Sequence, residues 1–402
     1  MRELFFPKAM GGIQPEILTW ARETAGLSLA AAAHAIGLNT AKGQSGAERL
    51  AALEAGAEEP SRPLLLKMSK SYHRPLLVFY LAEPPTTGDR GQDFRTLPGP
   101  ERYNPGLDVL VRDIKARQGL IHSILEDDRA EPLDFIGSVT TGVPVKTLAA
   151  SIAKRLSFRL QEFRAAKNGG EAFVYLRKTI EDSGVYVLLL GNLGSHHTNI
   201  PVEIFRGFAL ADQIAPLIVI NDQDARAAWA FTAFHELVHL WLGDTGISGA
   251  DAGNRVEQYC NDVAGELLLP IEEIHILSPT IKGSLATIAG EVRAFAEVRH
   301  VSRQMVAYKL LRTGILPKAT WAALNTHFNE QWVQHKQREA EKNMATEGGP
   351  NYYVVKRHRV GPALLGLVRR SLDEGTITYT KASLVLGVKP RNVEPLLSRG
   401  AR

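Results

Sequence analysis

Apolar residues in the first part of the chain recur at the three- and four-residue spacing of amphipathic helices. The segments with this spacing are residues 15–38, 47–56 and 62–81. Ser28 is placed to cap the second of two helices in the first segment, and Gly56 marks the end of the helix in the second segment. Pro84 and Pro85 then end the helical pattern, so we expect the first domain to cover residues 1–90.

The period of the pattern changes in the middle of the chain. Residues 107–125 and 145–163 are still spaced as helices with one buried face. Three later runs are short, rich in β-branched or aromatic residues, and bounded by Gly, Asn or Pro: residues 184–191, 203–210 and 216–221. They predict strands of one sheet. A helix over residues 224–242, which Gly243 ends, follows the last of them.

This order of elements predicts an α+β protein in which a small sheet and its helices lie between helical domains. The expected domains are residues 1–90, 91–280, 281–335 and 350–402. The chain has 402 residues, of which 45% are hydrophobic and 22% charged, as is typical of a soluble globular protein. It lacks an apolar run long enough to span a membrane and lacks a secretory signal at its start. We therefore expect a cytoplasmic protein without a membrane partner.

Charge is distributed unevenly along the chain. Residues 271–402 contain 20 Lys and Arg against 11 Asp and Glu, a net charge of +9, and the net charge of +4 for the whole chain leaves −5 for residues 1–270. A basic excess suits an acidic partner such as DNA, although a solvated basic surface explains it as well.

One helix in this basic region is a candidate for nucleic-acid contact. Ser302 is placed to cap it after the turn "RHV", and it carries Arg303, Lys309 and Arg312. Contact of these three side chains with phosphates is the functional interpretation, and a helical scaffold is the alternative.

The segment "FTAFHELVHLWLG", residues 231–243, contains two histidines at the spacing of one helical turn. His235 and His239 therefore project side by side and can hold one ion. Glu236 lies about 100° around the helix from His235, where it can accept a proton from a water molecule without being a ligand. Because Cys260 is the single cysteine, a metal here must rest on histidine and carboxylate ligands.

A third ligand decides between a metal site and two histidines on a core helix. Glu257 lies in the next predicted helix, and Asn261 follows it by one turn on the same face, where it can steady a ligand by a hydrogen bond. Glu266, deeper in that helix, and Asp251, in a Gly-rich loop, are the alternative ligands. Glu266 fits the role of a salt-bridge partner or surface charge better.

These motifs resemble the ImmA/IrrE metallopeptidases, in the long form with an N-terminal XRE-type helix-turn-helix. The resemblance rests on "HELVHL", "EQYCNDVAGELLLP", "FRGFAL" and "PLIVIN", and on "LTWARETAGLSL", "YHRPLLVFYLAEPP" and "DFRTLP" in the N-terminal part. It implies a zincin-like core flanked by helix-turn-helix-type domains. It also implies Zn²⁺ held by His235, His239 and Glu257, with Glu236 as the catalytic base.

The resemblance further implies an endopeptidase that cleaves a regulatory protein, either a repressor or an antitoxin-like or toxin partner. Such cleavage would control a stress, mobile-element or toxin–antitoxin response. An extended substrate would add to the sheet edge near residues 203–210. The alternative function is a DNA-binding transcription regulator or antitoxin whose metal site is structural or vestigial. The polar insertion at residues 39–46 and the acidic helix after it weigh against DNA readout by the N-terminal domain.

Overall fold

The helices of the N-terminal part begin and end where local capping residues allow. They are α1 (Pro15–Glu23), α2 (Leu29–Ala35), α3 (Gly46–Glu54), α4 (Arg62–Ser71) and the 3₁₀ helix η1 (Leu76–Tyr80). The Ser28 hydroxyl accepts a hydrogen bond from the Ala31 N–H and so caps α2, as predicted. Ser45 and Glu48 form a reciprocal capping box on α3. Gly56, with φ 74°, follows the last turn of α3 in the left-handed conformation that glycine favours.

The computed structural model describes residues 13–41, 43–72, 74–84, 104–194, 198–248, 255–277, 283–344 and 351–398. The chain divides into two compact units, one formed by residues 1–93 and 99–111 and the other by residues 94–98 and 112–402. The segments 281–335 and 350–402, expected to be separate domains, both fall within the second unit. Their independence stays a prediction.

A small sheet lies at the centre of the second unit. Its strands are β1 (Tyr186–Leu189), β2 (Gly207–Leu210), β3 (Leu217–Ile220) and β4 (Gly246–Ser248), in the order β1-β3-β2-β4. β1 pairs with β3 in parallel, and the other pairings are antiparallel. All residues of β1, β2 and β3 are buried, which explains why these strands are continuously apolar rather than alternating.

The position of β2 bears on where a substrate could add to the sheet. An extended substrate was expected at the sheet edge near residues 203–210, and β2 itself is hydrogen-bonded to β3 on one side and to β4 on the other. Among the described residues, β4 is the edge strand on that side of the sheet.

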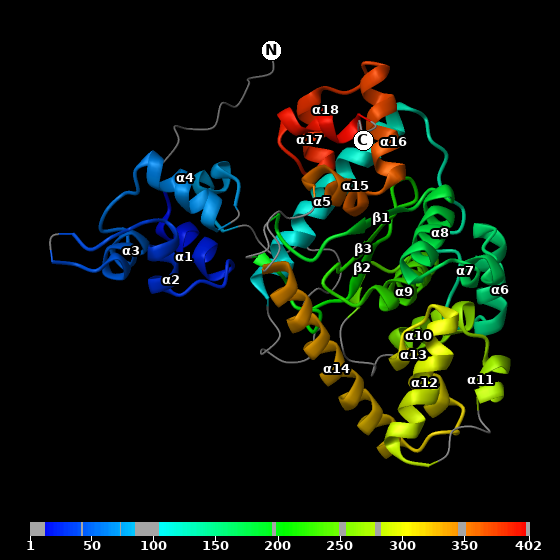
Figure 1. The fold of residues 1–402 in the computed structure, drawn as a ribbon. Coiled ribbons are helices and arrows are strands. Elements are labelled where there is room, and N and C mark those ends of the chain that lie inside the picture. The colour runs from blue at the N-terminus through cyan, green and yellow to red at the C-terminus, as the bar shows by residue number, and fades with distance from the viewer. Residues whose placement is uncertain are drawn as a thin grey trace. The chain divides into compact units, whose positions relative to one another are not determined.

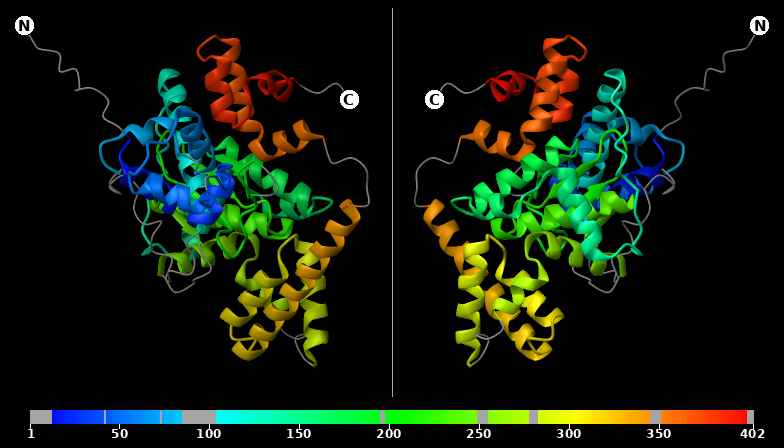
Figure 2. Two further views of the ribbon diagram at one scale, coloured as in Figure 1. Left: turned by 90° about the vertical axis from the view of Figure 1, so that its left-hand side faces the viewer. Right: turned by 90° about the vertical axis from the view of Figure 1, so that its right-hand side faces the viewer.

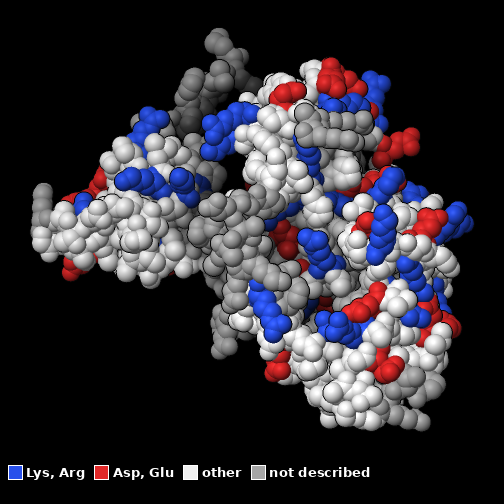
Figure 3. All heavy atoms as spheres, in the orientation of Figure 1, with Lys and Arg blue, Asp and Glu red and all other residues white. Residues whose placement is uncertain are grey.

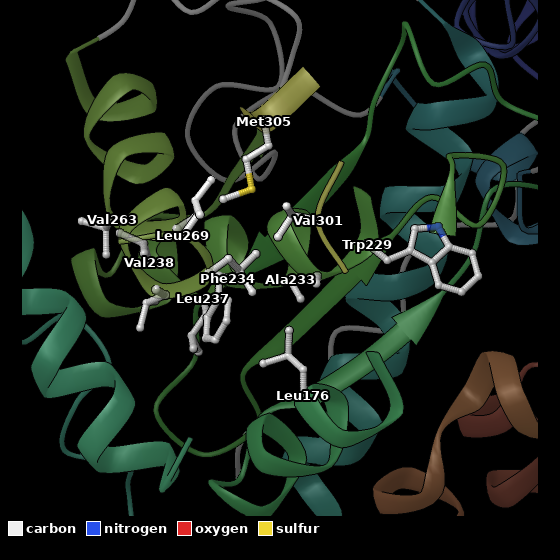
Figure 4. Packing of buried hydrophobic residues seen from close by; sticks show 14 of the residues in the cluster. Leu176, Trp229, Ala233, Phe234, Leu237, Val238, Val263, Leu269, Val301 and Met305 are labelled. Atoms are coloured by element: carbon white, nitrogen blue, oxygen red, sulfur yellow. The ribbon is translucent and has the colours of Figure 1, made fainter. Parts of the chain in front are cut away.

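Helices before and after the sheet build the core around it. They are α5 (Pro105–Asp127), α6 (Val145–Leu156), α7 (Leu160–Arg164), α8 (Gly169–Asp182), α9 (Arg226–Leu242), α10 (Arg255–Leu268) and α11 (Ile271–Leu277). Helix α8 packs against β1 and α9 against β2 and β3, so both cover the same face of the sheet (Figure 1). Helix α10 packs on α9 and α6. In Figure 4, Ala233, Phe234 and Leu237 of α9 point into the shared cluster of buried side chains.

The last helices occupy two different sides of the second unit. They are α12 (Leu285–Arg299), α13 (Arg303–Arg312), α14 (Lys318–Met344), α15 (Tyr352–Val360), α16 (Pro362–Asp373), α17 (Tyr379–Leu386), the 3₁₀ helix η6 (Pro390–Asn392) and α18 (Val393–Leu397). Helices α12 and α13 lie on the α10 and α11 side, whereas α15 packs against β1 with α16 to α18 beyond it (Figure 2). A buried ion pair on α8 holds α15 and α16: Arg177 donates to the carbonyl of His358, and Glu181 accepts from the Ala363 N–H.

These elements confirm the α+β prediction and three predicted strands, and they add β4, which was not predicted. No helix among the residues described here has the length and apolar character needed to cross a bilayer.

Gly243 ends α9 as predicted, with φ 71°. A Cβ at this position would lie 2.8 Å from Cα of Gly137, whose N–H donates to the carbonyl of Leu240 in the last turn of α9. Only glycine therefore satisfies both the left-handed conformation and the close backbone approach.

Replacing Gly243 with Ala is expected to lower the free energy of unfolding by about 1–3 kcal/mol, because it combines left-handed strain with a backbone clash. Calorimetry of the full chain measures the effect. The matched control is Gly290→Ala, because Gly290 is exposed in α12 with nothing within 4 Å of an added Cβ. That control should be neutral or slightly stabilising. Equal melting temperatures for the two variants would contradict the proposed role of the Gly137–Gly243 contact.

Candidate metal centre

The two histidines of α9 lie side by side and are almost completely buried. Their exposed fractions are 4% for His235 and 2% for His239. Their Nε2 atoms are 3.2 Å apart, as expected for side chains separated by one helical turn. Both rings therefore present the same type of nitrogen to one point.

Glu257 of α10 completes the cluster. Its Oε2 lies 3.2 Å from Nε2 of His235, and its Oε1 lies 3.3 Å from Nε2 of His239. One ligand atom from each of the three residues can be chosen so that all lie within 4.8 Å of one another. Helix packing thus brings together the three residues that the sequence analysis named as ligands.

The electrostatics of the cluster favour an ionised carboxylate. Burial of the Glu257 carboxyl raises its pKa, but hydrogen bonds and charge interactions with His235 and His239 outweigh this effect and hold the pKa at about 2. Glu257 is therefore an anion at neutral pH, the form that a metal ligand requires.

Glu236 is fully buried on the sheet side of α9. A Cβ built on Gly207 of β2 would lie 2.8 Å from Oε1 of Glu236 and 2.6 Å from Cγ2 of Thr232. The absence of a side chain at Gly207 therefore makes room for the Glu236 carboxylate. Sequence analysis did not identify Gly207, because this close approach between a strand and a helix has no signal within either segment.

The neighbours of the histidine rings differ from those expected. Among the described residues Asn261 makes no hydrogen bond to His235, His239 or Glu257, so its expected steadying role stays a prediction. Oδ2 of Asp244, two residues after the end of α9, instead lies 3.7 Å from Nδ1 of His239. This interaction with His239 lowers the pKa of Asp244 despite its partial burial.

Of the two alternative ligands, Glu266 is described by the structure and does not belong to the cluster. Glu266 forms an ion pair with Lys309 at 3.2 Å, the salt-bridge role expected for it. Asp251 lies outside the described residues.

The candidate nucleic-acid helix is formed as predicted, with the Ser302 hydroxyl accepting from the Met305 N–H at the start of α13. Its basic side chains are nevertheless engaged within the protein. Lys309, with a side chain only 11% exposed, pairs with Glu266, and Arg312 pairs with Asp262 at 2.9 Å.

Arg303 donates to Gln331, and its guanidinium lies 5.5 Å from the ring centroid of Phe328. The three cations thus do not form one free basic face, and the burial of Lys309 argues against the expected phosphate contact. On the face of the second unit seen in Figure 3, basic and acidic side chains are interspersed.

Comparison with known proteins gives one match. No curated protein and no solved structure matches the chain. Residues 184–311 match the family model Peptidase_M78, described as the IrrE N-terminal-like domain. The matched range includes the sheet, α9, α10 and α13. The match supports the resemblance to the ImmA/IrrE family and implies a metallopeptidase domain.

Proposed function

We propose that the chain is a zinc-dependent endopeptidase of the ImmA/IrrE type, with a zincin-like core, that acts in the cytoplasm on a regulatory protein. A repressor or an antitoxin-like or toxin partner is the substrate that the resemblance implies. The observation that carries the proposal is the convergence of His235, His239 and Glu257 beside the buried Glu236. The match to a metallopeptidase family model supports it.

The donor set fits Zn²⁺ in kind and in spacing. Zinc prefers tetrahedral coordination by imidazole nitrogen and carboxylate oxygen at about 2.1 Å, which places neighbouring ligand atoms about 3.4 Å apart. The two Nε2 atoms are 3.2 Å apart, and each lies close to a different oxygen of Glu257: His235 to Oε2 at 3.2 Å and His239 to Oε1 at 3.3 Å. With one atom taken from each residue, all three lie within 4.8 Å of one another. Two imidazoles and one carboxylate also leave one of four positions open, the arrangement of catalytic rather than structural zinc. When bound, the ion would supply Lewis-acid chemistry for peptide hydrolysis.

Glu236 is the residue we assign to proton transfer. It is adjacent to His235 in sequence but is directed about 100° around α9, so it stays out of the ligand set while remaining next to it. Its carboxylate would accept a proton from the attacking water and then deliver that proton to the leaving amine. The close approach of Gly207 restricts the rotamers available to this side chain, which would hold it in place for both transfers.

The N-terminal unit is proposed as a helix-turn-helix-like module that contacts protein rather than DNA. Arg49, the basic residue of α3, donates to the carbonyl of Asn39, and Glu54 pairs with Arg22 at 2.7 Å. Helix α3 therefore offers little positive charge to phosphate. Together with the paired cations of α13, this weakens the alternative of a DNA-binding regulator.

Replacing Glu236 with Gln is expected to leave zinc bound at about one ion per chain while peptide cleavage falls by roughly 10²- to 10⁴-fold, because an amide cannot accept the proton. Metal content of protein purified without chelator and cleavage of a proteome-derived peptide library measure the two effects. The matched control is His239→Ala, which should lose both metal and activity. Undiminished cleavage by Glu236→Gln, or full zinc occupancy in His239→Ala, would show the assignment of roles to be wrong.

Replacing Gly207 with Ala is expected to displace the Glu236 carboxylate, because the new methyl group would lie within 3 Å of it. Since the ligands do not contact Gly207, zinc content should stay at the wild-type level while kcat falls at least tenfold, as is typical when a proton-transfer group moves. The two readouts are metal analysis and steady-state kinetics on the same preparation. Wild-type kcat in this variant would mean that the Gly207 contact does not position Glu236.

A further inference from the structure

A cavity of about 250 Å³ lies one helical turn away from the metal centre. Phe231, one turn before His235 on α9, lines the cavity, and its ring centroid is 6.2 Å from that of His235. Asn261, one turn after Glu257 on α10, lines it as well. Residues in an extended chain advance about 3.3 Å each. When a substrate places its scissile peptide bond at the metal centre, the side chain of the neighbouring residue can therefore reach the cavity.

The walls of the cavity come from five helices of the second unit: α6, α9, α10, α11 and α13. Helix α9 contributes Phe231, α6 begins at Val145, and α13 contributes Met305 and Tyr308. These side chains are aliphatic, aromatic or thioether groups, and they suit an apolar occupant. Its volume is below that of pockets for drug-sized ligands, about 300–1,000 Å³, and fits one large side chain.

Each charged group of the cavity has an ion-pair partner, and that of Lys146 is Glu272. Lys309 pairs with Glu266 at 3.2 Å and also donates to the carbonyl of Leu269. Arg312 pairs with Asp262 at 2.9 Å. A charged side chain entering the cavity would lose its hydration and would have to break one of these pairs to gain a partner. A neutral side chain avoids both costs.

Asn261 supplies a polar group that remains available in the cavity. Its side chain makes no hydrogen bond with the residues that the structure describes, and the side-chain amide offers both a donor and an acceptor. An extended substrate has unpaired backbone N–H and C=O groups, which such an amide can satisfy without selecting for charge.

We propose that this cavity is the subsite for a large, neutral, apolar side chain, such as Leu, Met or Phe, on the substrate residue next to the scissile bond. The inference rests on the proposed peptidase function and names the class of sequence that it cleaves. Helix α13 then forms one wall of the subsite. This role agrees with the ion pairs of Lys309 and Arg312, which leave little free positive charge on that face.

The test compares the full-length wild type with Val145→Trp, which narrows the cavity from its partly exposed wall. A proteome-derived peptide library, with cleavage sites read by mass spectrometry, identifies the preferred residues. Peptides that differ only in Leu or Ala at the selected position then give kcat/KM ratios. The matched control is Val174→Trp, because Val174 is 55% exposed on α8 and is not among the residues that line the cavity. Zinc content is measured for every variant.

The wild type and Val174→Trp are expected to cleave the Leu peptide at least tenfold better than the Ala peptide, as for apolar pockets that discriminate by size. Val145→Trp should reduce or invert this ratio with unchanged zinc content. If Val145→Trp fails to fold, Met305→Ala provides the second test. This substitution widens the cavity, so it should increase kcat/KM for a peptide that has Trp at the selected position.

Other outcomes separate the two claims. Cleavage by the wild type without an apolar preference, or with a preference for a charged residue at that position, would overturn the subsite while leaving the peptidase intact. The same Leu-to-Ala ratio in Val145→Trp and in the wild type would also overturn it. Absence of any cleavage by the zinc-loaded wild type would instead overturn the proposed function, and the subsite with it.

Discussion

The packing of α9 between the sheet and α10 is the constraint on which the rest of the second unit depends. One side of α9 carries Ala233, Phe234 and Leu237 into the core cluster, with the Phe234 ring edge-on to Phe158 at 5.1 Å. The same burial removes His235 and His239 from water. Buried polar rings need partners, and α10 provides one in Glu257. The interactions that stabilise the core therefore also assemble the candidate site.

Helix α10 also fixes the position of α13, because the two helices are in direct contact. Its Gly265 allows Lys309 to lie close, since an added Cβ would be 2.9 Å from Cε of Lys309. The ion pairs of Lys309 with Glu266 and of Arg312 with Asp262 then hold the last turn of α13 against α10. The cavity between these helices is thus positioned by the same element that supplies the third ligand. The proposed metal centre and the proposed subsite therefore both depend on the position of α10.

Sequence analysis succeeded where the signal is local. The cap at Ser302, the end of α9 at Gly243 and the apolar strands all follow from interactions within a few residues, and the structure contains each of them. The spacing of His235 and His239 is local as well, which is why the candidate ligands were predictable. Strand β4 was not predicted, because three residues carry no periodicity and its pairing comes from β2.

The features that the sequence did not reveal depend on contacts between residues distant in the chain. In the sequence, Lys309 and Arg312 indicate a basic helix face. Their carboxylate partners lie 43 and 50 residues earlier in the chain, on α10. The close approach of Gly207 to Glu236 is a contact between strand β2 and helix α9, which are separate segments of the chain. Composition and spacing describe what a helix carries, whereas the function of a face depends on what packs against it.

The most direct measurement is anomalous X-ray diffraction at the zinc absorption edge, from crystals of protein purified without chelator. The account predicts a single strong peak between Nε2 of His235, Nε2 of His239 and the Glu257 carboxylate, at about 2.0–2.2 Å from each. It would be contradicted by crystals in which Glu257 is hydrogen-bonded directly to both imidazoles with no anomalous peak between them.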